Sequence, residues 1–294
     1  MAKKRKKRER ERSFGLFSIF PYLILILALF YIYSRYIGTS GILVKNYSET
    51  SSKIPESFDG FSIVSFSDMK IGSTFSIDSI DKLVDTINKQ KPDLVLFTGD
   101  VIAPGTKISL KDKEKIVNKL SKIDPLIGKY SVKGNEDYRN DYYESIMINS
   151  GFKDITNNYE LIYYKGLTPI VIYGIGSNIK KDVDLKKAFS YPNKDVDTNY
   201  MATYRILLSH EPDSIEKVKN YNIALMLSGH SLNSSINIPF LKEQYNIKGA
   251  TKYYDEKYTV DKTKLYISSG LGTNEYKVRF NSKPSISLFR LYTK

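Results

Sequence analysis

The chain has 294 residues, a net charge of +13 and no cysteine, which excludes disulfide bonds and thiolate metal sites. The positive charge gathers at the start, where residues 1–12 hold eight Lys or Arg and two Glu, a net +6. The remaining +7 is spread along the rest of the chain without a basic stripe. This distribution argues against a nucleic-acid partner.

An apolar segment follows the basic tail of residues 1–13. Residues 14–33 centre on the run Leu23–Phe30, and no charge occurs before Arg35. About 20 apolar residues cross a ~30 Å hydrocarbon core. A cleavable signal peptide is the rival interpretation, but its apolar run is usually ~7–15 residues and a small-x-small cleavage site follows it. We therefore predict an uncleaved transmembrane anchor over residues 14–37.

The charges around this segment predict its orientation. Basic residues precede the span and only Arg35 lies close behind it, so the positive-inside rule places the N-terminus in the cytoplasm. We expect a single-pass protein of the cell membrane whose basic tail meets anionic lipid headgroups. Residues 38–53, partly polar, are predicted to be a linker, and residues 54–294 one extracytoplasmic domain.

Apolar runs and helical spacings alternate in the first half of that domain. The pattern predicts strands at 61–66, 93–97 and 126–132, with helices at 77–89, 109–123 and 138–150. Strands predominate later, at 160–164, 170–173, 204–208, 224–227, 265–268 and 286–291. This order predicts an α/β (α+β) fold in which two packed sheets are covered by helices, rather than one doubly wound sheet.

Polar side chains follow five of the predicted strands where each one ends. They are Asp68, Asp100, Asn135, His210 and His230, and the last two are the only histidines of the chain. Each alone is ordinary turn chemistry or a structural histidine. Together they would meet at the carboxyl edge of a sheet, where α/β proteins bind ligands. Carboxylate, amide and imidazole groups there predict a site for a divalent metal.

The order of these motifs resembles the calcineurin-like metallophosphoesterase family, particularly its membrane-associated bacterial branch. The family pattern is D-x-H, G-D, G-N-H-[DE], a lone H and G-H-x-H. The corresponding segments here are 68–70 (Asp-Met-Lys), 99–100 (Gly-Asp), 134–137 (Gly-Asn-Glu-Asp), 209–210 (Ser-His) and 229–232 (Gly-His-Ser-Leu). The resemblance covers residues 54–291 and implies a four-layer sandwich of two mixed sheets flanked by helices.

The resemblance also implies a pair of metal ions about 3.5–4 Å apart that polarise phosphate and activate water. One metal would keep all its ligands, Asp100, Asn135, His210 and His230. This set of two nitrogens and two oxygens suits one manganese, iron or zinc ion.

Three departures from the family pattern damage the other half of the site. Lys70 and Leu232 stand at two histidine positions of the first metal, which is left with Asp68 and the shared Asp100. Glu136 replaces the histidine that assists the leaving group in the family. The first metal and the catalytic histidine are therefore predicted to be lost.

Three functions are compatible with such a site. In a slow one-metal hydrolase, Lys70 replaces part of the missing charge and Glu136 transfers a proton if burial raises its pKa. In a non-catalytic binding or scaffold protein of the cell envelope, Lys70 neutralises the carboxylates and Leu232 seals the pocket. In a relic site, no metal binds. The substrate, a phosphoester small molecule or lipid, and the oligomeric state stay open.

Overall fold

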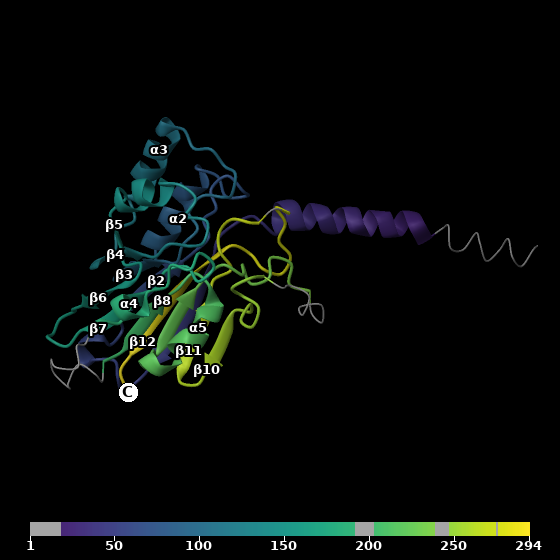
Figure 1. Ribbon diagram of the computed structural model, residues 1–294. Helices are drawn as coiled ribbons and strands as arrows, with labels where there is room; N and C mark the ends of the chain where they lie inside the picture. Colours follow the sequence, from purple (N-terminus) through teal and green to yellow (C-terminus); the bar gives the residue numbers. More distant parts are fainter. Residues whose placement is uncertain (1–18, 192–202, 239–246, 275) are drawn as a thin grey trace, which may run out of the picture.

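Figure 1 shows the computed structural model, which describes residues 19–191, 203–238, 247–274 and 276–294. The predicted basic tail and the first residues of the anchor lie outside this part of the chain. Two six-stranded sheets form the centre of the domain. The two sheets confirm the predicted fold class. Helices alternate with strands only in the first half of the chain, and strands dominate the second half.

The first sheet combines the two ends of the domain. In spatial order it contains β1 (Leu43–Thr50), β12 (Ser285–Tyr292), β2 (Ser62–Phe66), β3 (Leu94–Phe97), β4 (Gly128–Ser131) and β5 (Phe152–Asp154). Strands β2 to β5 run parallel, β12 is antiparallel to β2, and β1 is parallel to β12. The loops after β2, β3 and β4 therefore leave the sheet at the same edge.

The second sheet has the same mixed character. Its order is β10 (Lys257–Val260), β11 (Thr263–Ile267), β9 (Leu225–Ser228), β8 (Arg205–Leu208), β7 (Ile170–Gly174) and β6 (Asn158–Ile162). The central strands β7, β8, β9 and β11 are parallel, and the outer pairs are antiparallel. The ends of β8 and β9 carry the two histidines.

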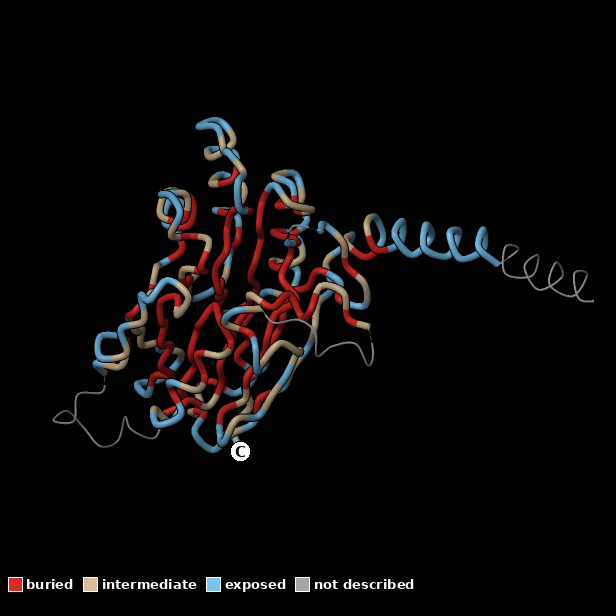
Figure 2. The backbone as a smooth tube through the Cα atoms, turned by 45° about the vertical axis from the view of Figure 1, so that its right-hand side comes forward, coloured by how far each residue is buried: buried red, intermediate tan, exposed pale blue. Residues whose placement is uncertain are grey.

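Three apolar cores divide the domain into layers. Ile63, Leu94 and their neighbours on the first sheet pack against Ile172 and Ile206 of the second. The other face of the first sheet packs against α2 (Ser79–Asn88) and α3 (Leu110–Leu120). The other face of the second sheet packs against a third core that includes α4 (Leu185–Ala188) and α5 (Ile215–Val218). Both sheets are covered on both faces, and Figure 2 shows their strands mostly buried.

Short helical turns complete the described elements. They are the 3₁₀ turns η2 (Glu56–Phe58), η5 (Pro212–Ser214) and η6 (Lys219–Tyr221), and the π-helical turns η1 (Tyr33–Ile37) and η3 (Glu144–Ile148). The helix predicted over 138–150 is wrong in its first part, because turns and bends occupy residues 138–141. Asn140 explains part of this, since its side-chain oxygen accepts a hydrogen bond from the backbone N–H of Tyr142.

The linker predicted over residues 38–53 is also wrong. Residues 43–50 form β1, which pairs with β12 along its whole length. Polar composition misled the prediction, because β1 is an edge strand and its polar side chains Lys45 and Glu49 pair with residues of the second sheet. The domain therefore begins at β1, a few residues after the N-terminal helix.

One helix of the described residues is long and apolar enough to cross a membrane. It spans Ile19–Ile37, includes η1 at its end, and projects from the domain with most of its residues exposed except at that end (Figures 1 and 2). Length and composition support a membrane association of the chain.

Candidate metal centre

Left-handed backbone conformations bring the strand ends together. Asp68, Asp100 and His230 have φ values of 48°, 65° and 69°, a region that costs most residues free energy. At Gly99, with φ of 96°, a Cβ atom would overlap the backbone of Gly134. The loops after β3 and β4 therefore touch, and this contact places Asp100 beside the segment that carries Asn135.

Lys70 lies at the centre of the site. Its Nζ atom is 2.5 Å from Asp100 Oδ2 and 3.5 Å from Asp68 Oδ1, and all three side chains are buried. Burial by itself would lower the pKa of Lys70, but the charges of Asp100 and Asp68 raise it above its ordinary value. Burial by itself would raise the pKa of Asp100, but the charges of His210 and Lys70 hold it well below its usual range. A permanent positive charge therefore sits between two carboxylates.

His210 contributes a nitrogen to the same point. Its Nδ1 atom lies 2.6 Å from the carbonyl oxygen of Thr98, so Nδ1 carries the proton that it donates and Nε2 faces the carboxylates. Nε2 is 3.3 Å from Asp100 Oδ2 and 4.0 Å from Asp68 Oδ1. Asp68, Asp100 and His210 form a buried group whose ligand atoms all lie within 4.8 Å of one another and could hold a metal ion.

His230 reaches the site from the second sheet. The centres of its ring and the His210 ring are 5.1 Å apart. Its backbone N–H donates to Asp68 Oδ2 at 2.9 Å, and its Nε2 lies 2.8 Å from the carbonyl oxygen of Lys248. The second contact leaves Nδ1 as the ring nitrogen with a lone pair. Burial lowers the pKa of His230, and the nearby His210 lowers it further.

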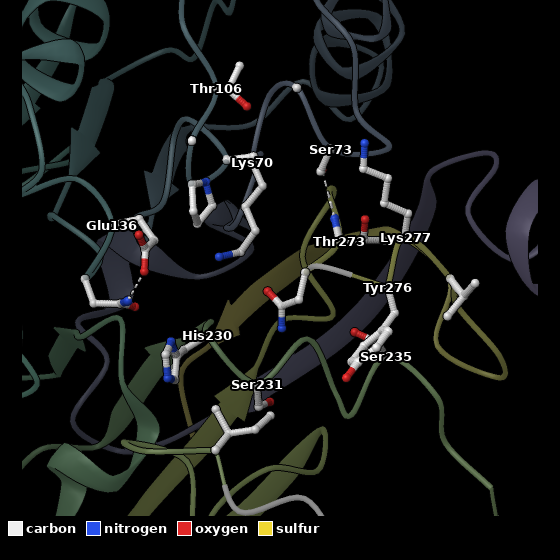
Figure 3. A pocket seen from close by; sticks show the side chains of 18 of the residues that line it. Lys70, Ser73, Thr106, Glu136, His230, Ser231, Ser235, Thr273, Tyr276 and Lys277 are labelled. Carbon is white, nitrogen blue, oxygen red and sulfur yellow. Dashed lines mark hydrogen bonds between the residues drawn. The ribbon is translucent and has the colours of Figure 1, made fainter.

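Asn135 and Glu136 form the wall beside Asp100. The amide nitrogen of Asn135 donates to Glu136 Oε1 at 2.7 Å (Figure 3), and the backbone N–H of Glu136 donates to Asp100 Oδ1 at 2.9 Å. The other carboxylate oxygen of Glu136 pairs with Arg139. The Asn135 side-chain oxygen is therefore left for another partner.

Three buried polar atoms test whether the site could accommodate a cation. Asp68 Oδ1, Asn135 Oδ1 and His210 Nε2 have no hydrogen-bond partner among the residues that the structure describes. A buried polar atom without a partner costs about 1–3 kcal/mol, and the oxygens of Asp68 and Asn135 offer lone pairs. Burial lowers the pKa of His210, but the charges of Asp100 and Asp68 raise it to about 10, so a metal ion would have to displace the proton on Nε2. The chemistry of the set fits one divalent ion, although the assignment of Asp100, Asn135, His210 and His230 as its ligands stays a prediction.

Leu232 occupies the place of a fourth histidine in the family pattern and has no atom that could bind a metal. It is fully buried, and a Cβ atom on Gly270 would overlap its side chain. The apolar contact closes the side of the site next to Asp68.

Sequence reasoning missed two residues that shape the site. Asp137 accepts hydrogen bonds from the backbone N–H groups of Asp100, Val101 and Gly134 at 2.8–2.9 Å, and so fastens the two loops together. Its position at the end of the Gly-Asn-Glu-Asp segment was the available signal. No sequence pattern pointed to Arg139, the partner of Glu136, because it lies in a turn where a helix was predicted.

The site opens into a cavity of about 780 Å³, within the range of small-molecule sites. Lys70, Glu136 and His230 line its base (Figure 3). Residues 276–278 and Ile236 line the opposite side, so the cavity joins a charged base to a partly apolar rim.

Comparisons with known proteins identify the family to which the chain is similar. Residues 61–234 match the family model described as calcineurin-like phosphoesterase. The chain is 31% identical to the uncharacterized metallophosphoesterase YkuE of Bacillus subtilis over 89% of both chains. It is 24% identical to the UDP-2,3-diacylglucosamine pyrophosphatase LpxG of Chlamydia muridarum, over 81% of this chain and 86% of LpxG.

A solved structure, the NAD nucleotidase of Haemophilus influenzae, superimposes with a TM-score of 0.44 at 15% identity, over 72% of this chain and 45% of the nucleotidase. The match to the family model covers more than half of the chain, and the similarity to YkuE extends over nearly all of it. The chain therefore belongs to the calcineurin-like phosphoesterase family of metal-dependent proteins.

Proposed function

We propose that this chain hydrolyses a phosphoester with one divalent cation, manganese, iron or zinc, and that Lys70 supplies the charge of the absent second ion. The observation that carries the proposal is the position of Lys70 Nζ, 2.5 Å from Asp100 and 3.5 Å from Asp68. These are the carboxylates that the resemblance assigns to the lost metal. A lysine there retains a positive charge in a place where leucine or alanine would remove it.

The bound cation would supply polarisation of a phosphoryl oxygen and a lower pKa for an attacking water molecule. Asp100, Asn135, His210 and His230 would hold it. Lys70 faces the base of the cavity, where its ammonium can pair with a second phosphoryl oxygen as negative charge develops. His210 is kept in one orientation by the carbonyl of Thr98, so it holds its nitrogen towards the site without rearrangement.

Protonation of the leaving group is the weak step of this mechanism. Glu136 accepts a hydrogen bond from Asn135 at Oε1 and pairs with Arg139 through Oε2, so both of its carboxylate oxygens already have polar partners. A missing general acid costs about 10²–10⁴-fold in rate. Substrates whose leaving group departs unprotonated should therefore be preferred. LpxG is named for cleaving the pyrophosphate bond of a UDP-sugar, in which the leaving group is a phosphate monoester, and we propose the same kind of leaving group here.

The contacts of Glu136 and Leu232 favour a second candidate, a non-catalytic binding or scaffold protein of the cell envelope. The Glu136–Arg139 pair and the buried Leu232 would then keep the pocket in one shape. In either case we propose that the N-terminal helix is a membrane anchor with the tail in the cytoplasm and the domain outside.

The test uses the full chain in lipid nanodiscs with Mn²⁺. We expect about one equivalent of bound metal and slow turnover of bis(p-nitrophenyl) phosphate. His210→Ala should remove both. Lys70→Met should keep the metal and lower kcat by about 10²–10³-fold, as loss of an electrostatic contact to the transition state does. Lys165→Met is the matched control. Lys165 is exposed and distant from Lys70 in the sequence, so its substitution should leave metal binding and turnover unchanged.

The outcomes separate the candidates. Metal binding without turnover would favour the binding protein. Unchanged turnover in Lys70→Met would show that Lys70 does not replace the second ion. Absence of metal binding would contradict both candidates.

A further inference from the structure

The end of the N-terminal helix is docked on the domain rather than joined by a loose linker. The backbone N–H of Arg279 donates to the carbonyl oxygen of Ser34 at 2.9 Å. At Gly38, a Cβ atom would overlap the carbonyl of Arg279. The ring of Phe280 lies 4.9 Å from the ring of Phe30 and 5.9 Å from that of Tyr33. Figure 1 shows the helix leaving the domain beside this segment.

The segment that receives the helix is also a wall of the cavity. We call residues 276–280 the rim segment; Tyr276, Lys277 and Val278 line the cavity, while Arg279 and Phe280 hold the helix. Phe280 also exchanges backbone hydrogen bonds of 2.8 Å with Ser235 and Asn237, next to Ile236 on the same wall. The helix end and the cavity rim are therefore one packed unit.

The distance from the rim to the apolar part of the helix is short. Phe280 touches Phe30, which lies inside the apolar run, and four extended residues reach at most about 14 Å from Phe280 to Tyr276. The headgroup layer on each side of a bilayer is roughly 5–8 Å thick. If the helix spans a membrane, the rim segment lies in or next to that layer.

The exposed residues at this level have the chemistry of a membrane interface. Tyr276 is 84% exposed, Tyr36 is 64% exposed, and Arg35 lies 5.3 Å from the Tyr36 ring. Lys277 is exposed beside Tyr276 (Figure 3). Tyrosine and basic residues are enriched where a protein meets lipid headgroups.

We propose that the rim segment lies in the headgroup layer of the membrane, and that the cavity receives its phosphate-bearing ligand as a lipid from that layer. The phosphate would meet Lys70 at the base, and the acyl part would pass Tyr276, Val278 and Ile236 towards the bilayer. The statement about the phosphate rests on the proposed hydrolysis; the position of the rim segment rests only on the proposed membrane anchor.

The first experiment measures the depth of the rim segment. The chain has no cysteine, so single nitroxide labels can be attached to Tyr276→Cys and, as a control on the far strand β6 side, to Tyr163→Cys. Tyr163 is 49% exposed, so a label at this position, as at 276, can be attached without displacing buried side chains. In nanodiscs of the full chain, we expect the label at 276 to be protected from a water-soluble relaxation agent and accessible to oxygen. A label at 276 as accessible to the water-soluble agent as the label at 163 would overturn the proposal.

The second experiment tests the source of the ligand. Nanodiscs would contain phosphatidic acid with a photoreactive acyl chain, and crosslinked peptides would be identified by mass spectrometry. We expect crosslinks in residues 231–236 and 276–280. Tyr276→Ala with Lys277→Glu should lower them by about fivefold or more, because one basic residue at an anionic surface has an effect of that size. The matched control, Tyr163→Ala with Lys165→Glu, should leave the number of crosslinks unchanged.

Competition decides between lipid and soluble ligands. Glycerol phosphate at equal concentration should leave the crosslinks unchanged, whereas full displacement would show that the cavity takes its ligand from water and would overturn the proposal. Crosslinking requires neither metal nor turnover. If crosslinks form as expected while no phosphoester is hydrolysed, the proposed function fails and the lipid-facing rim stands.

Discussion

Lys70 and Leu232 stand at positions that the family resemblance assigns to two histidines of one metal, and the two residues affect the site in different ways. Lys70 keeps a positive charge within 3.5 Å of two buried carboxylates. Leu232 replaces a ligand by apolar packing against Gly270. One substitution conserves charge and the other conserves volume, so the carboxylates remain paired and the core remains filled.

Restoring both histidines should restore the second metal. We expect Lys70→His with Leu232→His to raise bound manganese from about one equivalent to about two, measured by elemental analysis of the full chain after dialysis. Lys70→His alone should not reach two, because the other histidine is still absent. Two equivalents on the unmodified chain would contradict the role given to Lys70.

The identity of the site residues can be predicted from the sequence more completely than the contacts that these residues make. Asp68 and Asp100 follow parallel strands of the first sheet, and His210 and His230 follow parallel strands of the second. Periodicity predicts these strand ends, but the four residues meet only because the two sheets pack against each other, which periodicity does not predict. The pairing of Glu136 with Arg139 does not follow from periodicity. It depends on turns at residues 138–141, and the helical spacing of the neighbouring apolar residues concealed those turns.

Strand β1 links the two sheets through alternate side chains. Lys45 and Tyr47 both contact Glu256, at 2.6 Å each, and Glu49 accepts from Lys264 and Tyr266 at 2.7 and 2.6 Å. Side chains at positions i and i+2 point to the same face of a strand. These polar contacts explain why β1 is polar and yet structural.

The contacts of Glu256 should make stability depend on acid. Burial would raise the pKa of Glu256, but the hydrogen bonds of Lys45 and Tyr47 lower it below its ordinary value. The unfolded chain then binds more protons, so this contribution is present above about pH 4.5 and is lost as the pH falls through the folded pKa. With EDTA present, the fall in melting temperature between pH 7 and pH 3 should be smaller in Glu256→Gln than in the unmodified chain.

Glu114→Gln, on the exposed face of α3, is the control and should follow the unmodified chain. An equal fall in Glu256→Gln would show that Glu256 contributes nothing to acid sensitivity.

Elements with an apolar run or a helical spacing could be predicted from sequence, even where they are only four residues long, as in β3, β8 and β9, whereas elements without such a pattern could not. The spacing of Ile80, Leu83, Val84 and Ile87 predicted α2, and all four are buried. β5 has only three residues, and β10 alternates between exposed and half-buried residues without an apolar run. Neither strand therefore has a sequence pattern that distinguishes it from the adjoining loops. β1 was missed because its partner, β12, lies at the other end of the chain, and local patterns carry no information on such pairing.

At the scale of the whole molecule, the contact between helix and domain fixes the direction of the N-terminal helix relative to the cavity. Gly38 allows this contact because it has no side chain to meet Arg279. Gly38→Ala should loosen the docking. Distances between spin labels at Tyr31→Cys and Tyr163→Cys in nanodiscs should change from a narrow to a broad distribution. Ser40→Ala, at an exposed position, should keep the narrow one. A broad distribution in the unmodified chain would contradict a rigid connection.

The pairing of β1 with β12 has a consequence for biosynthesis. Leu43 pairs with Ser285, and Thr50 with Tyr292, so the first strand after the helix has no partner until the last strand has been made. Contacts that join residues so far apart close slowly. An anchored chain would therefore carry an open strand beside the bilayer throughout translation, and loss of its last ten residues would leave that strand free to pair with another chain.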